Sequence, residues 1–256
     1  MIKIKNKKEI EIMAKSGNIL ANTLFEVLRH VEPGVSEKEL DKLADDLIVK
    51  QGGYPGFKKV PGYHNATCIA TNDVVVHGIP SDYRLKEGDV IAIDCGVFYK
   101  GYHSDMCETV RVRSKGSKLK KDRVDEFLEI GKKALEEGIK AAKLGNHVGD
   151  ISKVIQDIVE KKAGYSVVRS LVGHGVGKEL HEDPEVPGYL MDRIEDTPVL
   201  KEGMVIAIEV IYNMGASDVV YANDDGWTIA TEDGSLSAVF ERTIAITKDG
   251  PLVLTK

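Results

Sequence analysis

The segment LKEGDVIAID, from Leu85 to Asp94, returns 115 positions later as LKEGMVIAIE, from Leu200 to Glu209. Eight of the ten positions are identical, and the last position keeps a carboxylate. A glycine turn signal followed by a β-branched apolar run predicts a buried strand in each copy. Each predicted strand therefore carries an acid, Asp94 or Glu209, within apolar surroundings.

A buried ionised carboxylate is costly unless a positive group meets it. An arginine or lysine could pair with Asp94 or Glu209, or each strand could emerge into solvent at its acid. The duplication favours another arrangement, because two halves that meet about a pseudo-two-fold axis would bring both acids toward one central place.

The repeat extends well beyond these strands. Asn6 with Glu9, and Ser36 with Glu39, resemble capping boxes, and each opens a predicted helix with helical apolar spacing. The first helix stops at 32–34 and the second at 52–54. The same order returns as predicted helices through 128–139 and 151–158, with stops at 144–146 and 163–165.

Three landmarks recur at nearly one offset: Gly17 and Gly131 are 114 residues apart, Tyr54 and Tyr165 are 111 apart, and Leu85 and Leu200 are 115 apart. The repeated unit is thus a whole half of the chain. The sequence predicts one catalytic domain, 1–256, of two related halves, about 1–115 and 116–256. The order of elements predicts an α+β fold, in which helices cover the outer face of a curved antiparallel sheet.

Composition excludes several classes of function. A net charge of −6 over 256 residues argues against nucleic-acid binding, which usually needs a basic excess. The lysine-rich N-terminus has no apolar signal region, and no apolar run approaches the length of a membrane span, so we expect a cytoplasmic protein. Cys68, Cys95 and Cys107 lack paired spacing, which suits a reducing compartment and excludes a cysteine-type zinc site.

A predicted hairpin brings a second acid to the first strand. The turn signal at 99–101 is followed by a strand that contains Asp105. A turn centred between Tyr99 and Lys100 places Asp94 opposite Asp105, with Cβ atoms roughly 5 Å apart, although a bulge would shift the register by one residue. Two carboxylates this close need a shared proton or a bound cation.

The second half offers the matching acids. Glu209 lies on its repeat strand, and Glu241 lies within the apolar run 237–246. Arg242 follows Glu241 directly, but adjacent side chains on a strand point to opposite faces, so the two are not expected to pair.

Histidines narrow the choice of chemistry. His174 lies among glycines, which allow the backbone to approach a ligand closely. Considered as isolated residues, His77 and His181 are interpreted as core or surface histidines. Four carboxylates and one imidazole suit two divalent ions such as Mn, Fe, Co or Zn. Two ions about 3.5–4 Å apart can share a water, lower its pKa toward ~7 and polarise a carbonyl. The residues by themselves therefore indicate a dinuclear metallohydrolase.

At these residues the chain resembles the methionine aminopeptidases of bacteria, a family with the pita-bread fold. The resemblance covers essentially 1–256 and is carried by five ligand types in order, His-Gly-Ile-Pro at 77–80, and the His-Gly-Val-Gly segment that leads to the second histidine. It implies a cytosolic enzyme that removes the initiator methionine from the N-termini of nascent polypeptides with a small second residue. It also implies two divalent metal ions, transient proximity to the ribosome, no direct nucleic-acid or membrane contact, and a monomer.

The resemblance also implies a role for each site residue. The implied metal ligands are Asp94, Asp105, His174, Glu209 and Glu241, with Asp105 and Glu241 bridging the ions, Asp94 on one ion, and His174 with Glu209 on the other. Glu209 would also shuttle the proton of the bridging water, and His77 and His181 would bind the scissile amide. The methionine pocket would involve Tyr63, Cys68 and Trp227.

Two positions depart from the family pattern. Leu180 stands where relatives often have an aromatic residue before the second histidine, and it would change the shape of the methionine pocket. Arg242 stands where many relatives have histidine. Neither residue belongs to the implied ligand set.

Two other readings compete with this one. Prolidase and aminopeptidase P share the fold and the five ligands, but usually carry an extra N-terminal domain, whereas this chain begins with the first predicted helix. A non-catalytic binding protein on the same fold is the other alternative; such proteins lose ligands, and here all five ligand types are present.

Overall fold

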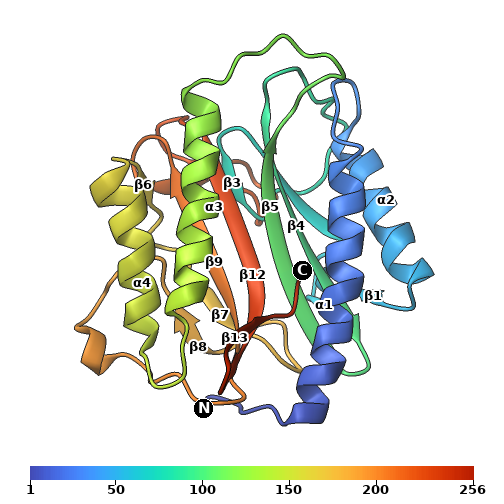
Figure 1. Cartoon of the computed structure of the whole chain (residues 1–256). Coiled ribbons are helices and arrows are strands. Elements are labelled where there is room, and N and C mark those ends of the chain that lie inside the picture. The colour runs from blue at the N-terminus through green and yellow to red at the C-terminus, as the bar shows by residue number, and fades with distance from the viewer.

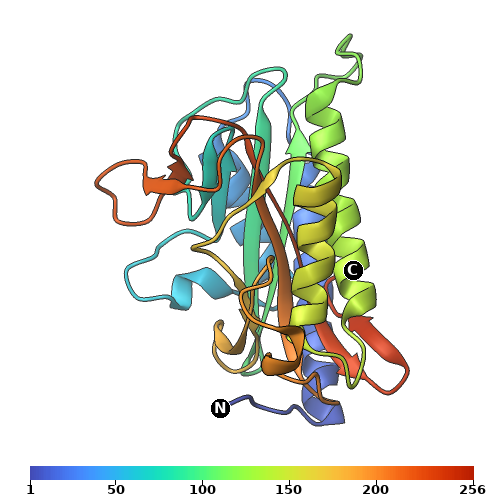
Figure 2. The same ribbon diagram turned by 90° about the vertical axis from the view of Figure 1, so that its left-hand side faces the viewer.

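A computed structural model describes all 256 residues. Its helices lie on one side of the molecule and its sheets on the other, as Figures 1 and 2 show. The helices are α1 (Lys7–Leu28), α2 (Glu37–Lys50), α3 (Arg123–Ala141) and α4 (Val148–Gln156), the last continued by a π-helical turn, η2 (Asp157–Lys162). Short 3₁₀ turns form η1 (Gly56–Lys59) and η3 (Ile194–Asp196). The predicted α+β fold is confirmed.

The strands form three antiparallel sheets. The first contains β1 (Tyr54–Pro55), β2 (Thr67–Thr71), β4 (Val90–Tyr99) and β5 (Tyr102–Arg111). The second contains β6 (Ser166–Val167), β7 (Gly173–Gly175), β8 (Glu182–Val186), β9 (Val205–Asn213), β12 (Ser237–Thr247) and β13 (Gly250–Val253). The third is small and joins β3 (Val74–Val76) to β10 (Val219–Tyr221) and β11 (Ile229–Thr231). No helix is both long and apolar enough to cross a membrane.

The helix boundaries follow the capping signals. Asn6 caps α1 and Ser36 caps α2, each in a reciprocal capping box with the glutamate three residues later. Such a box pairs backbone donors that the first helical turn leaves without intrahelical partners. These two predicted helix starts are confirmed.

Two repeated glycines let the long helices pack closely, α1 against the C-terminal segment and α3 against β12. A Cβ on Gly17 of α1 would lie 2.3 Å from the carbonyl oxygen of Leu254, and one on Gly131 of α3 would lie 2.4 Å from the Phe240 ring. The Tyr212 hydroxyl accepts a hydrogen bond from the Gly131 N–H at 3.1 Å. The close approach excludes water and buries one apolar cluster beneath α1 and α2 and another beneath α3 and α4.

The predicted register of the β4–β5 hairpin is wrong. Its two-residue turn consists of Lys100 and Gly101, with φ angles of 47° and 91°, the left-handed pair of a type I′ turn. Asp94 therefore lies opposite Cys107, and Asp105 lies opposite Gly96. The register differs from the expectation by two residues, so Asp94 and Asp105 still point to the same face of the sheet.

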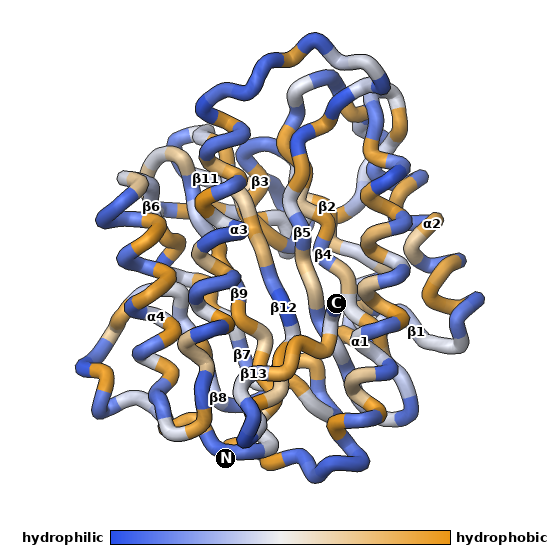
Figure 3. The backbone as a smooth tube through the Cα atoms, viewed as in Figure 1, coloured by the Kyte–Doolittle hydropathy of each residue, from blue (hydrophilic) through white to orange (hydrophobic).

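The two large sheets carry their acids at equivalent places. Asp94 of β4 lies opposite Cys107 of β5, and its repeat equivalent, Glu209 of β9, lies opposite Glu241 of β12. Glu241 is thus the counterpart of Cys107. Figure 3 shows the resulting hydrophilic interruption in the middle of β12, which is otherwise largely apolar.

Candidate metal centre and substrate pocket

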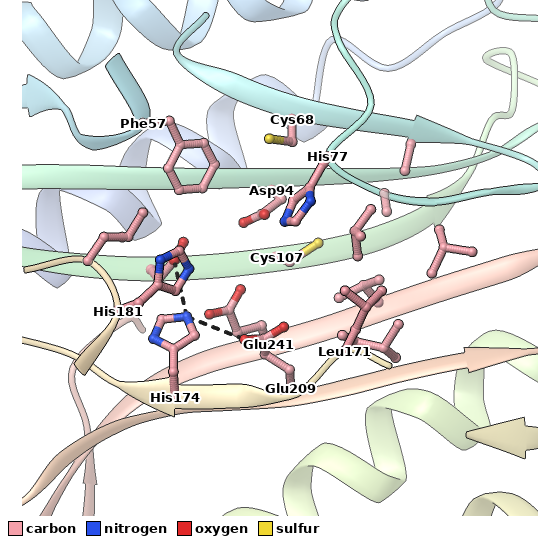
Figure 4. Close-up of a pocket in the computed structure, with 18 of the residues that line it drawn as sticks. Phe57, Cys68, His77, Asp94, Cys107, Leu171, His174, His181, Glu209 and Glu241 are labelled. Carbon is pink, nitrogen blue, oxygen red and sulfur yellow. Dashed lines mark ion pairs between the residues drawn. The ribbon is translucent and has the colours of Figure 1, made fainter. Parts of the chain in front are cut away.

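Five side chains from five strands converge on the face of the sheets that the helices leave uncovered. They are Asp94 of β4, Asp105 of β5, His174 of β7, Glu209 of β9 and Glu241 of β12. Figure 4 labels Asp94, His174, Glu209 and Glu241. One ligand atom from each of Asp105, His174 and Glu241 lies within 4.8 Å of the others. His174 Nε2 lies 3.5 Å from Glu209 Oε1 and 3.9 Å from Asp105 Oδ2. The strands therefore gather hard oxygen donors and an imidazole around one small volume.

No lysine or arginine forms an ion pair with these four carboxylates. Arg242, the nearest cation in sequence, points to the opposite face and pairs with Glu108 at 2.6 Å. Asp94 Oδ1 and Glu241 Oε1 are buried atoms without a hydrogen-bond partner. Neither explanation first considered for these acids, a basic partner or emergence into solvent, accounts for the group.

The electrostatic cost of this arrangement is visible in the pKa values. Burial raises the pKa of Asp94 to about 7. Burial and the negative charges of neighbouring acids raise the pKa values of Asp105 and Glu241 well above the ordinary range. Burial, and then the charge of Asp94, does the same to the pKa of Glu209. These four acids repel one another and resist ionisation until positive charge is supplied.

His174 is held in the form that binds metal ions. Burial, followed by the neighbouring His181, lowers its pKa to about 3, so the ring is neutral. Its Nδ1–H donates to the carbonyl oxygen of Gly175 at 2.9 Å, because a carbonyl can only accept. Nε2 therefore keeps its lone pair, which faces the carboxylates. The orphaned acid oxygens and this tautomer fit divalent metal ions.

Two further histidines flank the acids. The His181 ring packs edge-on against His174, with centroids 4.3 Å apart. His77 adopts a left-handed backbone conformation with φ of 56°, after which Gly78 passes so close to Ile69 that a Cβ would lie 2.0 Å from its carbonyl oxygen. That turn directs His77 into the same cavity, where Figure 4 shows it beside Asp94.

An apolar pocket adjoins the acids on one side. Phe57, Tyr63, Cys68 and Leu180 form a buried cluster against which Val60, Ile79 and Trp227 pack. The Tyr63 and Trp227 rings meet edge to face at 5.1 Å, and the Tyr63 hydroxyl donates to the Thr67 carbonyl oxygen at 2.7 Å. Because the hydroxyl is occupied, the pocket presents carbon and sulfur surfaces to a ligand.

A single cavity of about 230 Å³ contains every site residue named from the sequence. It also exposes residues that sequence reasoning missed. Phe57 lies on η1 and had no periodic signal. Ala92, Val239 and Ile211 lie two residues from Asp94, Glu241 and Glu209, respectively, and share their face. The period-two rule could have found these three.

Comparisons with known proteins identify the family of the chain. Metallopeptidase family M24 matches residues 11–248. A methionine aminopeptidase of Clostridium perfringens is 44% identical over 255 residues, covering 100% of this chain and 99% of the relative. Methionine aminopeptidase 1 of Bacillus subtilis is 43% identical and is covered completely, as is this chain.

Solved structures give the same result. A methionine aminopeptidase from Thermotoga maritima superimposes with a TM-score of 0.93 at 40% identity, with 100% of both chains covered. A prolidase from Pyrococcus furiosus superimposes with a TM-score of 0.75 at 28% identity, and this chain covers 65% of it. The chain therefore belongs to metallopeptidase family M24 and, within that family, to the methionine aminopeptidases.

Proposed function

We propose that this enzyme uses two divalent ions to remove the initiator methionine from nascent polypeptides whose second residue is small. The observation that carries the proposal is a cluster of four largely buried carboxylates and one neutral imidazole, with no lysine or arginine paired to the carboxylates. An apolar pocket of suitable chemistry adjoins it. Residues 1–256 would form the single catalytic domain, built of two related halves.

The ligand set divides between the two sheets. Asp94 and Asp105 would hold the ions from the first sheet, and His174, Glu209 and Glu241 would hold them from the second. Four carboxylates balance the four charges of two divalent ions, which explains why no lysine or arginine is needed. When bound, the ions would supply Lewis acidity toward the substrate carbonyl and acidify a nearby water. Mn, Fe, Co and Zn all suit this mixed oxygen and nitrogen set.

Glu209 is placed to move a proton. As a carboxylate beside the water that the ions would acidify, it could accept the proton of that water and pass it to the leaving amine. The same group therefore acts as base toward water and as acid toward the amine.

His77 and His181 would hold the scissile amide from two sides. Burial lowers the pKa values of both imidazoles, which favours their neutral, hydrogen-bonding forms. A neutral N–H of His181 can donate to the amide oxygen as negative charge develops there, an arrangement of the oxyanion-hole type. His77, on the opposite wall, is placed to orient the amide.

The apolar pocket would select methionine. Its walls, Tyr63, Cys68, Leu180 and Trp227 with Phe57 and Val60, are apolar, and an unbranched thioether can adapt to such a surface.

The test is to add Mn, Fe or Co to metal-free protein and compare cleavage of Met-Ala-X, Gly-Pro and X-Pro peptides. We expect metal-dependent release of methionine from Met-Ala-X and little cleavage of the proline peptides. Preferential cleavage of Gly-Pro or X-Pro would assign the site to prolidase-like chemistry. No cleavage of any peptide, with metal bound, would support the non-catalytic alternative.

A further inference from the structure

The two large sheets meet along β5 and β12, which run side by side in Figure 1. Backbone hydrogen bonds pair β5 with β4, and they pair β12 with β9 and β13, but none joins β5 to β12. We call this boundary the seam. Contacts across it depend on side chains.

Two threonines bridge the seam by the same pattern. The Thr109 hydroxyl accepts from the Val239 N–H at 2.9 Å and donates to the Val239 carbonyl oxygen at 2.6 Å. The Thr243 hydroxyl likewise accepts from the Asp105 N–H at 2.9 Å and donates to the Asp105 carbonyl oxygen at 2.7 Å. Each threonine replaces a missing pair of backbone hydrogen bonds, and both are fully buried.

A third tie crosses the seam on the helix-covered face. Arg242 of β12 donates through Nη2 to Glu108 Oε2 of β5 at 2.6 Å. Its Nη1 donates to the carbonyl oxygen of Glu241 at 2.7 Å and to that of Cys107 at 3.2 Å. One guanidinium therefore holds main-chain atoms of both strands at the level of the acids.

The three ties lie close to the place where the seam divides the proposed metal ligands between the two sheets. Asp94 and Asp105 belong to the first sheet, whereas His174, Glu209 and Glu241 belong to the second. Thr109 lies two residues after Cys107 on β5, and Thr243 lies two residues after Glu241 on β12. One threonine bridge therefore lies on each side of Cys107 and Glu241. The mutual repulsion of the four acids acts to spread the seam, and the ties oppose it.

We propose that the seam ties, Thr109, Thr243 and the Arg242–Glu108 pair, are positioning groups that set the separation between the two halves of the metal-ligand set. This inference rests on the proposed function, from which it takes the ligands. Thr109 is the most informative of the ties, because its hydroxyl bonds only to Val239, which is not a proposed ligand.

The test measures Mn²⁺ binding to metal-free protein by titration calorimetry. Thr109→Val removes the hydroxyl at nearly constant shape and should weaken Mn²⁺ binding by about 10–100-fold, the usual effect of losing a group that orients ligands. Thr109→Ser restores the hydroxyl and should bind within about threefold of the wild type. Thr23→Val is the matched control, because Thr23 is equally buried but bonds to Gln51 on the α1–α2 side.

The outcomes separate a positioning role from a purely structural one. If Thr109→Val and Thr23→Val are destabilised alike in urea but bind Mn²⁺ as the wild type does, the inference is overturned. If Thr109→Val does not fold, Glu108→Gln loosens the same seam from the other face and replaces it in the titration, with the same expected loss. Asp105→Asn is the reference: normal Mn²⁺ binding by that variant would instead refute the proposed ligand set.

Discussion

Glu182 ties the loop that carries His181 to the N-terminal segment. Its side chain is 2% exposed and accepts from Lys5 Nζ at 2.9 Å, and Lys5 is itself only 5% exposed. Lys3 Nζ contributes a second ion pair at 3.0 Å from a more exposed position. The carboxylate also accepts from the backbone N–H groups of Lys178 and Glu179, at 3.1 and 3.4 Å. Glu182 therefore links the loop before His181 to the N-terminal segment that carries Lys3 and Lys5.

Glu182→Gln removes the charge and keeps an oxygen for the backbone donors. Removing one partner of a buried ion pair typically costs about 3–5 kcal/mol, because the other charge stays buried without compensation. We expect a loss of this size in the free energy of unfolding at pH 7. Adding Lys5→Met to Glu182→Gln removes the buried, unpaired charge of Lys5 and should recover most of the lost free energy of unfolding. Adding Lys3→Met instead should recover little, because Lys3 is exposed.

The pH dependence has a definite sign. Burial alone would raise the pKa of Glu182, but hydrogen bonds from Lys5 and Lys3 outweigh it and hold the pKa below the ordinary value of 4.5. The folded state thus favours the ionised form, and its contribution is present above pH 4.5 and lost as the pH falls through the lowered folded-state pKa. The stability difference between wild type and Glu182→Gln should shrink accordingly in acid.

Urea denaturation of the wild type, Glu182→Gln and the two double variants measures these differences. Turnover of a Met-Ala peptide by the folded fraction should also fall, because His181 loses its support. A loss below about 1 kcal/mol at pH 7, the size expected of an exposed pair, would refute the argument that Glu182 and Lys5 form a buried tie.

Three other predictions concern the site. Asp105→Asn should lose turnover and bound metal together, as measured by peptide cleavage and elemental analysis; normal metal content with full activity would exclude it as a ligand. Met-Ala peptides should be cleaved at least tenfold faster than Leu-Ala peptides, because a poorer fit in an apolar pocket costs roughly 1–3 kcal/mol, and equal rates would mean that Leu180 has widened the pocket. His181→Ala should keep its metal and bind a product-like methionine analogue nearly normally, while kcat falls on the order of 10²–10³-fold. His174→Ala should instead lose metal. Equal metal loss in both variants would make His181 a ligand.

The sequence alone determined the features that depend on local chemistry. Capping boxes at Asn6 and Ser36 marked helix starts, because the groups that satisfy one another lie three residues apart. The predicted hairpin placed Asp94 and Asp105 on one face, and period-two alternation separated Glu241 from Arg242. These results survived the error in the hairpin register, because a shift of two residues preserves the face of every side chain.

Only the tertiary structure decided which groups meet. The type I′ turn at Lys100 and Gly101 placed Cys107, not Asp105, opposite Asp94. The partner of Arg242 is Glu108, and the pocket includes Phe57. The hairpin turn sets the first of these contacts, whereas the Arg242–Glu108 pair depends on how the two sheets pack at the seam, and the place of Phe57 depends on how η1 packs over β2 and the Leu180 segment. The sequence indicates which residues are buried, but the packing of the elements decides which residues they contact.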